Sequence, residues 1–193
     1  MTAVLKTEAW LSPAAYLELE RTSQIRHEYV GGTIQAMAGA SRSHNVIAGN
    51  IFAAIHGHLR GKPCRAFMND MRLRLNYPNG QQVYYYPDIM VTCRQMPDPN
   101  HVEEPAVIIE VLSRDTEDVD RREKFFSYTG LSSLNCYVLV DQYRRQVEVF
   151  QRADAGWTKE LLHHYSDTLH LPDIMFHMSV EAIYEDAFDD ATP

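Results

Sequence analysis

The stretch Pro105-Ala106-Val107-Ile108-Ile109-Glu110-Val111-Leu112-Ser113 (residues 105–113) places one carboxylate in the middle of an apolar run. Its valine and isoleucine content favours an extended chain over a helix, and such a run is typical of a strand that is covered on both faces. A buried carboxylate is unfavourable unless a metal ion, a cation or a proton pairs with it. Glu110 therefore predicts a partner elsewhere in the chain.

Length and charge set bounds on the class of protein. The 193 residues, 45% of them hydrophobic, are enough for one domain with a sizeable core. We expect a single domain over residues 1–193, with its core at about 20–152 and an acidic C-terminal segment at about 180–193. The net charge of -8 is the opposite of what a general nucleic-acid coating protein carries. The charge count still permits a local basic face.

The N-terminus and the cysteines suggest a compartment. The first residues contain no uninterrupted apolar segment, and no window approaches the roughly 18 apolar residues of a membrane-spanning helix. The three cysteines, Cys64, Cys93 and Cys136, are far apart and form no C-x-x-C motif, which argues against a disulfide framework and against a zinc ribbon. We expect reduced, packed thiols in a cytoplasmic protein without membrane association.

Periodicity and turn residues predict an ordered series of helices and strands. We expect a hairpin around a Gly-Gly pair and a less regular final third from Trp157 onward. The predicted helices span 12–23, 44–59 and about 115–128; the predicted strands span 64–75, 83–86, 87–92, 105–113, 136–140 and 146–152, and the hairpin spans 26–37. This order predicts an α/β domain with a mixed β-sheet flanked by helices.

Two acidic residues and a lysine in these elements suggest chemistry. Asp88 begins one predicted strand and Glu110 lies in the next strong one, so both carboxylates point to one side if the two strands pair. Two such oxygen donors suit Mg²⁺ or Mn²⁺. Lys124 follows on the next predicted helix, on the face that it shares with Asp120 and Tyr128. An ammonium there can orient a water or neutralise phosphate charge.

Structural alternatives stay open for the same residues. Asp88 can bond to a backbone amide, Lys124 can be a solvated helix lysine, and Glu110 with Lys124 can form a purely structural ion pair. The chain contains no G-x-x-x-x-G-K-[ST] loop, no G-x-S-x-G elbow and no H-E-x-x-H helix. The commonest rival enzyme classes therefore lack their motifs.

An ordered set of motifs resembles the Uma2 family, a group of restriction-endonuclease-like proteins within the PD-(D/E)xK nuclease superfamily. The resemblance covers about residues 20–152. The motifs are Glu28-Tyr29-Val30-Gly31-Gly32, Ala38-Gly39-Ala40-Ser41-Arg42-Ser43-His44-Asn45, Tyr86-Pro87-Asp88-Ile89, Ile109-Glu110-Val111-Leu112-Ser113, Asp120 with Lys124 and Tyr128, and Tyr137-Val138-Leu139-Val140-Asp141. It implies a mixed four- or five-stranded core between helices.

The resemblance also implies an activity and a site. It implies a metal-dependent endonuclease that hydrolyses DNA phosphodiester bonds, as a homodimer by analogy with related folds. The divalent metal, Mg²⁺ or Mn²⁺, would be held by Asp88, Glu110 and the backbone of Val111. Glu28 and His44 match polar positions that are associated with the pocket. For His44 the alternative is a helix N-terminal histidine that is bonded to a local carboxylate or exposed to water. For Glu28 the alternative is a surface residue beside the Gly-Gly hairpin. The alternative is a nuclease-fold module that binds or interacts without turnover.

One position departs from the pattern of the superfamily. The superfamily lysine stands two residues after the second acid, where this chain has Leu112. Lys124 would replace it from the helix that follows. For contact with DNA, five basic residues stand against Asp70 alone in one stretch, namely Arg60, Lys62, Arg65, Arg72 and Arg74.

Overall fold

The strand that carries Glu110 lies inside a six-stranded mixed sheet with the order β11-β10-β9-β8-β6-β3. In the computed structural model, which describes residues 10–37, 39–114 and 117–188, all of β8 (Val107–Leu112) is buried. It pairs parallel with β9 (Cys136–Asp141) and antiparallel with β6 (Ile89–Thr92). The predicted strand and the mixed α/β class are confirmed, with six strands in place of the four or five that the resemblance implied.

The remaining strands of this sheet come from before β6 and after β9 in the sequence. They are β3 (Arg65–Met68), β10 (Val147–Ala153) and β11 (Gly156–Leu162). All of their pairings are antiparallel, so the pair β8 and β9 is the parallel step in the sheet. A parallel step needs a crossover connection, and the chain between the two strands supplies it as the helical segment 117–129.

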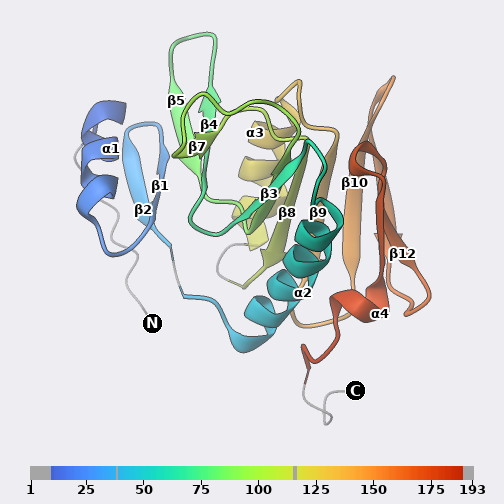
Figure 1. Cartoon of the computed structure of the whole chain (residues 1–193). Helices are drawn as coiled ribbons and strands as arrows, with labels where there is room; N and C mark the ends of the chain where they lie inside the picture. Colours follow the sequence, from blue (N-terminus) through green and yellow to red (C-terminus); the bar gives the residue numbers. More distant parts are fainter. Residues whose placement is uncertain (1–9, 38, 115–116, 189–193) are drawn as a thin grey trace. The chain divides into compact units, whose positions relative to one another are not determined.

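Helices cover the two faces of this sheet (Figure 1). Helix α2 (Arg42–His58) buries Ile47, Ile51 and Ile55 in one core with Ile109 of β8. Side chains alternate along a strand, so Glu110 points to the opposite face. There η1 (Val119–Lys124) and α3 (Phe125–Thr129) pack on the sheet.

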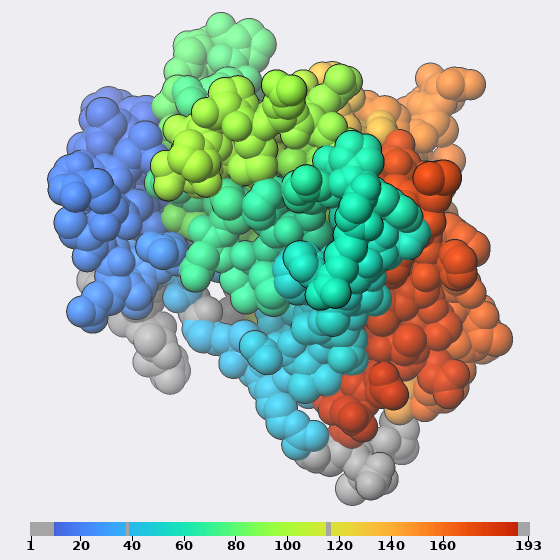
Figure 2. All heavy atoms as spheres, viewed as in Figure 1, coloured from blue at the N-terminus to red at the C-terminus, as the bar shows by residue number. Residues whose placement is uncertain are grey.

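The C-terminal segment is regular, which corrects the expectation of an irregular final third. After β11 it forms β12 (Thr168–Leu171), η2 (Pro172–Ile174), β13 (Phe176–Ser179) and α4 (Val180–Ile183). The side chain of Asn50 on α2 donates to the backbone carbonyls of Ile183 and Glu185. Figure 2 shows this segment lying along the flank of α2. Short strands with few residues each give weak periodicity, which is why the pattern was not visible in the sequence.

A second sheet has the order β2-β1-β5-β4-β7. Its strands are β1 (His27–Val30), β2 (Thr33–Ala36), β4 (Arg72–Asn76), β5 (Gln82–Tyr85) and β7 (His101–Val102), and α1 (Pro13–Thr22) accompanies them. The rings of Tyr16, Tyr29 and Tyr84 pack together in the core of this sheet. The hairpin predicted at Gly31-Gly32 is confirmed, because both glycines take positive φ angles between β1 and β2.

The two sheets belong to two compact units of the chain. Unit 1 holds Asp70–Tyr86, Met96–Glu103 and the described part of the first 39 residues; unit 2 holds Ala40–Asn69, Pro87–Gln95 and the described residues from Glu104 on. The strand predicted over 64–75 is therefore wrong. It is broken after β3 at Asn69, which has a positive φ of 50°, a conformation that asparagine tolerates better than most residues. The expectation of one domain stays a prediction.

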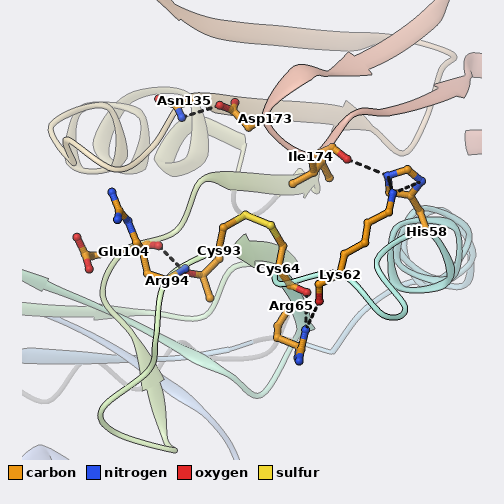
Figure 3. Close-up of a disulfide and its surroundings, with 11 residues drawn as sticks. His58, Lys62, Cys64, Arg65, Cys93, Arg94, Glu104, Asn135, Asp173 and Ile174 are labelled. Carbon is orange, nitrogen blue, oxygen red and sulfur yellow. Dashed lines mark hydrogen bonds between the residues drawn. A yellow bond between two sulfur atoms is a disulfide. The ribbon is translucent and has the colours of Figure 1, made fainter.

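The cysteine prediction is wrong for two of the three residues, because Cys64 and Cys93 form a disulfide. It is confirmed for Cys136, which is a buried free thiol. The pairing Arg65↔Thr92 between β3 and β6 puts the next residues, Cys64 and Cys93, opposite each other. Figure 3 shows this bridge, with Lys62 before β3 and Arg65 at the first position of the strand. A separation of 29 residues hides the pairing in the sequence.

The remaining expectations concern residues that the structure does not describe, the helix predicted over 115–128, and membrane association. Ala38, Asp115 and the tail from Asp189 onward lie outside the described residues. The predicted helix 115–128 is present from residue 117 as a π-helical stretch followed by α3. No helix in the described part of the chain has the length and apolar character that crossing a membrane requires.

Candidate active site

The carboxylates of Asp88 and Glu110 each accept a backbone N–H from the neighbouring strand segment, where β6 begins beside the C-terminal half of β8. Asp88 directly precedes β6, and the register Ile89↔Ile109 puts it opposite Glu110. The Asp88 N–H donates to Glu110 Oε2 at 3.1 Å, and the Val111 N–H donates to Asp88 Oδ2 at 2.7 Å. The expected pairing of the two strands therefore brings the two carboxylates together.

Lys124 and Tyr128 reach the other oxygen of Glu110. Lys124 Nζ lies 3.2 Å from Glu110 Oε1 and 3.0 Å from Asp120 Oδ1. The Tyr128 hydroxyl donates to the same Glu110 oxygen at 3.0 Å. Glu110, Asp120 and Lys124 are 3%, 2% and 5% exposed, so these contacts are made away from water. The partner that the sequence required for Glu110 is thus a lysine shared between two carboxylates.

The helix that delivers these groups is irregular. Val119–Lys124 is a π-helix, and the chain continues directly into α3. Stretches of π-helix are rare overall, and those that occur often lie at functional sites. They displace side chains from α-helical spacing. The Tyr137 hydroxyl of β9 donates to the Asp120 carbonyl at 3.0 Å. This bond anchors the π-helical turn to the sheet.

His44 approaches from the other face of the sheet. Ser41 caps α2 by accepting the His44 N–H at 3.1 Å, which fixes the first turn of the helix. His44 Nε2 then lies 3.1 Å from Asp88 Oδ2, and the ring also bonds to the backbone of Val111. The side chains of His44 and Asp88 are 13% and 15% exposed. They form the more open side of the cluster.

The environment shifts the proton affinity of two of these groups. Burial raises the pKa of Glu110 well above its usual value; the charge of Lys124 opposes this, whereas Asp120 and Asp88 add to it. For His44, burial alone would lower the pKa, but the hydrogen bond and the charge of Asp88 leave it raised. Groups with such shifts in one cluster are typical of functional sites.

Glu28 and the basic residues lie differently. Glu28 is half-buried on β1 of unit 1, whereas His44, Asp88, Glu110, Val111 and Lys124 all lie in unit 2. The structure therefore assembles four of the five proposed catalytic residues, and the role of Glu28 stays a prediction. The basic stretch is divided between the units, with Arg60, Lys62 and Arg65 in unit 2 and Arg72 and Arg74 in unit 1.

Sequence reasoning left out several residues that the structure places in the cluster. Asp120 and Tyr128 were recognised as neighbours of Lys124 on the helix, but no role was given to them. Gln142 was missed, and Ser41, which stands in one of the family motifs, was given no role in the site. The Ser41 hydroxyl donates to Gln142 Oε1, and Gln142 Nε2 donates to the Leu112 carbonyl at 2.8 Å. The i, i+4 spacing of Asp120, Lys124 and Tyr128 was a usable signal, whereas Gln142 gave none.

The donor set fits one divalent cation that is completed by water. Mg²⁺ and Mn²⁺ sites commonly use one or two carboxylates, with waters and substrate oxygens in the other positions. Asp88 and Glu110 supply two neighbouring carboxylates, and the Val111 backbone lies beside them, since its N–H donates to Asp88. Among the described residues, no group of three or more His, Cys, Asp or Glu side chains has the geometry of a metal site. The side chains thus match an open site better than a closed cage.

The fold defines the class of protein. The structure superposes on a crystal structure from Anabaena variabilis, named a "putative nuclease belonging to DUF820", with a TM-score of 0.75 and 18% identity, over 91% of this chain and 98% of that one. At this identity the likeness shows the fold alone, which is a mixed α/β fold shared with that protein.

The sequence comparisons give the family. The chain belongs to the Uma2 family, whose description is "Putative restriction endonuclease" and whose model matches residues 13–181. An uncharacterized Synechocystis protein is 33% identical over 176 residues, covering 90% of this chain and 91% of the relative. A second uncharacterized Synechocystis protein is 31% identical over 159 residues, covering 80% and 88%.

Proposed function

We propose that the chain is a Mg²⁺- or Mn²⁺-dependent endonuclease that hydrolyses DNA phosphodiester bonds. The observation that carries this is the neighbouring carboxylate pair Asp88 and Glu110, with Lys124 3.2 Å from Glu110. Membership of a family described as "Putative restriction endonuclease" supports it. Two carboxylates with a buried cation suit a reaction at a charged phosphate.

Each residue of the cluster has a proposed part in the reaction. Asp88, Glu110 and the Val111 carbonyl would hold the metal, which when bound would polarise a phosphoryl oxygen and lower the pKa of a bound water. Lys124 offsets negative charge that develops on the phosphate. His44, bonded to Asp88 on the open side of the cluster, holds or takes the proton of the attacking water.

A cleavage assay tests the proposal. Wild type, Asp88→Ala, Glu110→Ala and Lys124→Ala are incubated with supercoiled, linear and single-stranded DNA in Mg²⁺ or Mn²⁺. We expect at least a 100-fold loss of cleavage in the two carboxylate variants. Asp154→Ala, an exposed acid in the β10–β11 turn, is the matched control and should retain full activity. Equal cleavage by all variants would sink the site.

Metal binding supplies a readout that does not depend on turnover. Mn²⁺ at about 100 times its Kd should stabilise the wild type by about 2.7 kcal/mol, because it binds only the folded chain. Thermal unfolding should show the rise in Tm for wild type and Asp154→Ala, and lose it in Asp88→Ala. Calorimetric titration with Mn²⁺ should agree.

A binding module without turnover is the second candidate. Leu112 in the position of the superfamily lysine favours it, since Lys124 is clamped between two carboxylates. Under this reading no Mn²⁺ binding depends on Asp88 and Glu110. The calorimetric titration therefore separates the two functions even if no DNA substrate is cut.

A further inference from the structure

The loop after β9 carries an exposed aromatic ring at the end of the strands where Asp88 and Glu110 meet. β8 and β9 run parallel with Leu112 opposite Asp141, so the residues that follow the two strands emerge at the same end of the sheet. Asp88 directly precedes β6, the antiparallel neighbour of β8, so it lies at that end too. Arg114 follows β8 and Tyr143 follows β9.

Arg114 and Tyr143 form a stacked pair. The Arg114 guanidinium carbon lies 4.9 Å from the centroid of the Tyr143 ring, and the Arg114 N–H donates to the Tyr143 hydroxyl at 3.4 Å. Tyr143 is nonetheless 49% exposed. Arg114 is three positions after Val111, so their Cα atoms are at most roughly 11 Å apart. The pair is therefore close to the carboxylates that the site is built from.

The loop that presents the ring is held by its own side chains. Asp141 Oδ1 accepts the N–H groups of Tyr143 and Arg144 at 2.8 and 3.2 Å, and its Oδ2 accepts Arg144 Nε at 2.8 Å. Gln142 is buried and joins the loop to β8 and to the start of α2. An aromatic ring in a fixed position loses little entropy when a ligand stacks on it.

The chemistry of this pair matches one kind of occupant. An exposed ring backed by a guanidinium offers a π surface, and arginine also attracts phosphate. A nucleobase with its own phosphate satisfies both features, and aromatic stacking is how unpaired bases are bound without sequence preference. A paired base inside a duplex does not offer its face to such a ring.

We propose that Tyr143 and Arg114 form a stacking platform for the base of an unpaired DNA nucleotide beside the scissile phosphate. The proposal rests on the proposed endonuclease function and names its substrate: a single strand, or a nucleotide that is splayed out of a duplex. Tyr143 supplies the surface on which the base stacks. Arg114 backs the ring and neutralises a flanking phosphate.

Binding without metal tests the platform separately from cleavage. Fluorescence anisotropy in EDTA measures the affinity of the whole chain for a labelled single-stranded oligonucleotide and for an abasic strand of the same length and charge. The wild type should bind the base-containing strand more tightly. Tyr143→Ala should lose about 5- to 150-fold in that affinity and bind both strands alike, whereas Tyr143→Phe should keep the difference.

A second arginine–aromatic pair in the same sheet is the matched control. The Arg152 guanidinium carbon lies 4.7 Å from the Trp157 ring centroid. This pair lies at the opposite end of the strands, because the Arg152 N–H donates to the carbonyl of Asn135, the residue before β9. Trp157→Ala should leave both affinities unchanged. The platform is overturned if wild type binds the two strands equally, if Tyr143→Ala binds like wild type, or if Trp157→Ala loses as much. Base-dependent binding through Tyr143 in a chain that cuts no DNA would instead refute the nuclease proposal alone.

Discussion

The Glu110 carboxylate is held by hydrogen bonds from three residues. Its Oε2 accepts the Asp88 N–H, and its Oε1 meets Lys124 and Tyr128. The carboxylate is thus satisfied without a metal, while Lys124 keeps Asp120 as a second partner. The structural ion pair that was an alternative reading is present, and it coexists with a geometry that suits a cation.

Glu110→Gln is expected to stabilise the metal-free protein at neutral pH. Burial holds the folded pKa of Glu110 well above its usual value of 4.5, although Lys124 opposes the shift. A raised folded pKa gives stability that is full below about pH 4.5 and is lost as the pH rises toward the folded pKa. Glutamine has no such dependence. The variant's advantage in Tm, measured in EDTA, should grow above about pH 4.5 and vanish below it; a constant difference would contradict the assignment.

Lys124→Met is expected to destabilise the protein by about 3–5 kcal/mol, because Glu110 and Asp120 then lose their cation in a buried place. Adding Glu110→Gln should recover part of this loss, since one buried charge is removed. Urea unfolding of the wild type, both single variants and the double variant completes the cycle. Additive effects would show that the two side chains do not interact.

At the scale of elements, the strand pair β3 and β6 is tied by the disulfide at the end remote from Asp88. The two strands pair from Arg65↔Thr92 to Met68↔Ile89. The disulfide between Cys64 and Cys93 therefore lies at one end of the pair, and Asp88, the residue before β6, lies at the other. The bridge therefore joins the edge strand β3 to the strand that positions the first carboxylate.

Reduction of this disulfide is expected to lower Tm by on the order of 10 °C. Closing a loop of 29 residues lowers the entropy of the unfolded chain and so raises its free energy by about 3–4 kcal/mol. Each kcal/mol of stability shifts Tm by about 2–4 °C in a protein of this size. Thermal unfolding with and without reductant measures it, with Cys136→Ser as the control that keeps the bridge. Thiol titration of the denatured, unreduced chain should find one free cysteine, and three free thiols would contradict the pairing.

At the scale of the whole molecule, one chain contributes one Asp88–Glu110 pair, and cutting both strands of a duplex at one place requires two sites. We therefore propose a homodimer, as related folds suggest. Sedimentation equilibrium should give twice the mass of one 193-residue chain, with and without Mn²⁺. A monomer that still nicks one strand would contradict the dimer and leave the site intact.

The sequence by itself determined the buried strand around Glu110, the hairpin at Gly31-Gly32, the helix after Ser41 and the mixed α/β class. Each of these depends on local chemistry: apolar runs, positive-φ glycines and a capping serine. The same local signals, with the family motifs, singled out Asp88, Lys124 and His44 as candidates.

Only the tertiary structure decided how these residues meet. The register Ile89↔Ile109 puts Asp88 opposite Glu110, and the pairing of β3 with β6 brings Cys64 to Cys93. The contact between Lys124 and Glu110, and the π-helical form of Val119–Lys124, are likewise absent from any local pattern. The physical reason is that strand register and side-chain pairing are fixed by burial between distant segments, and a one-residue slip would turn Glu110 to the other face of the sheet.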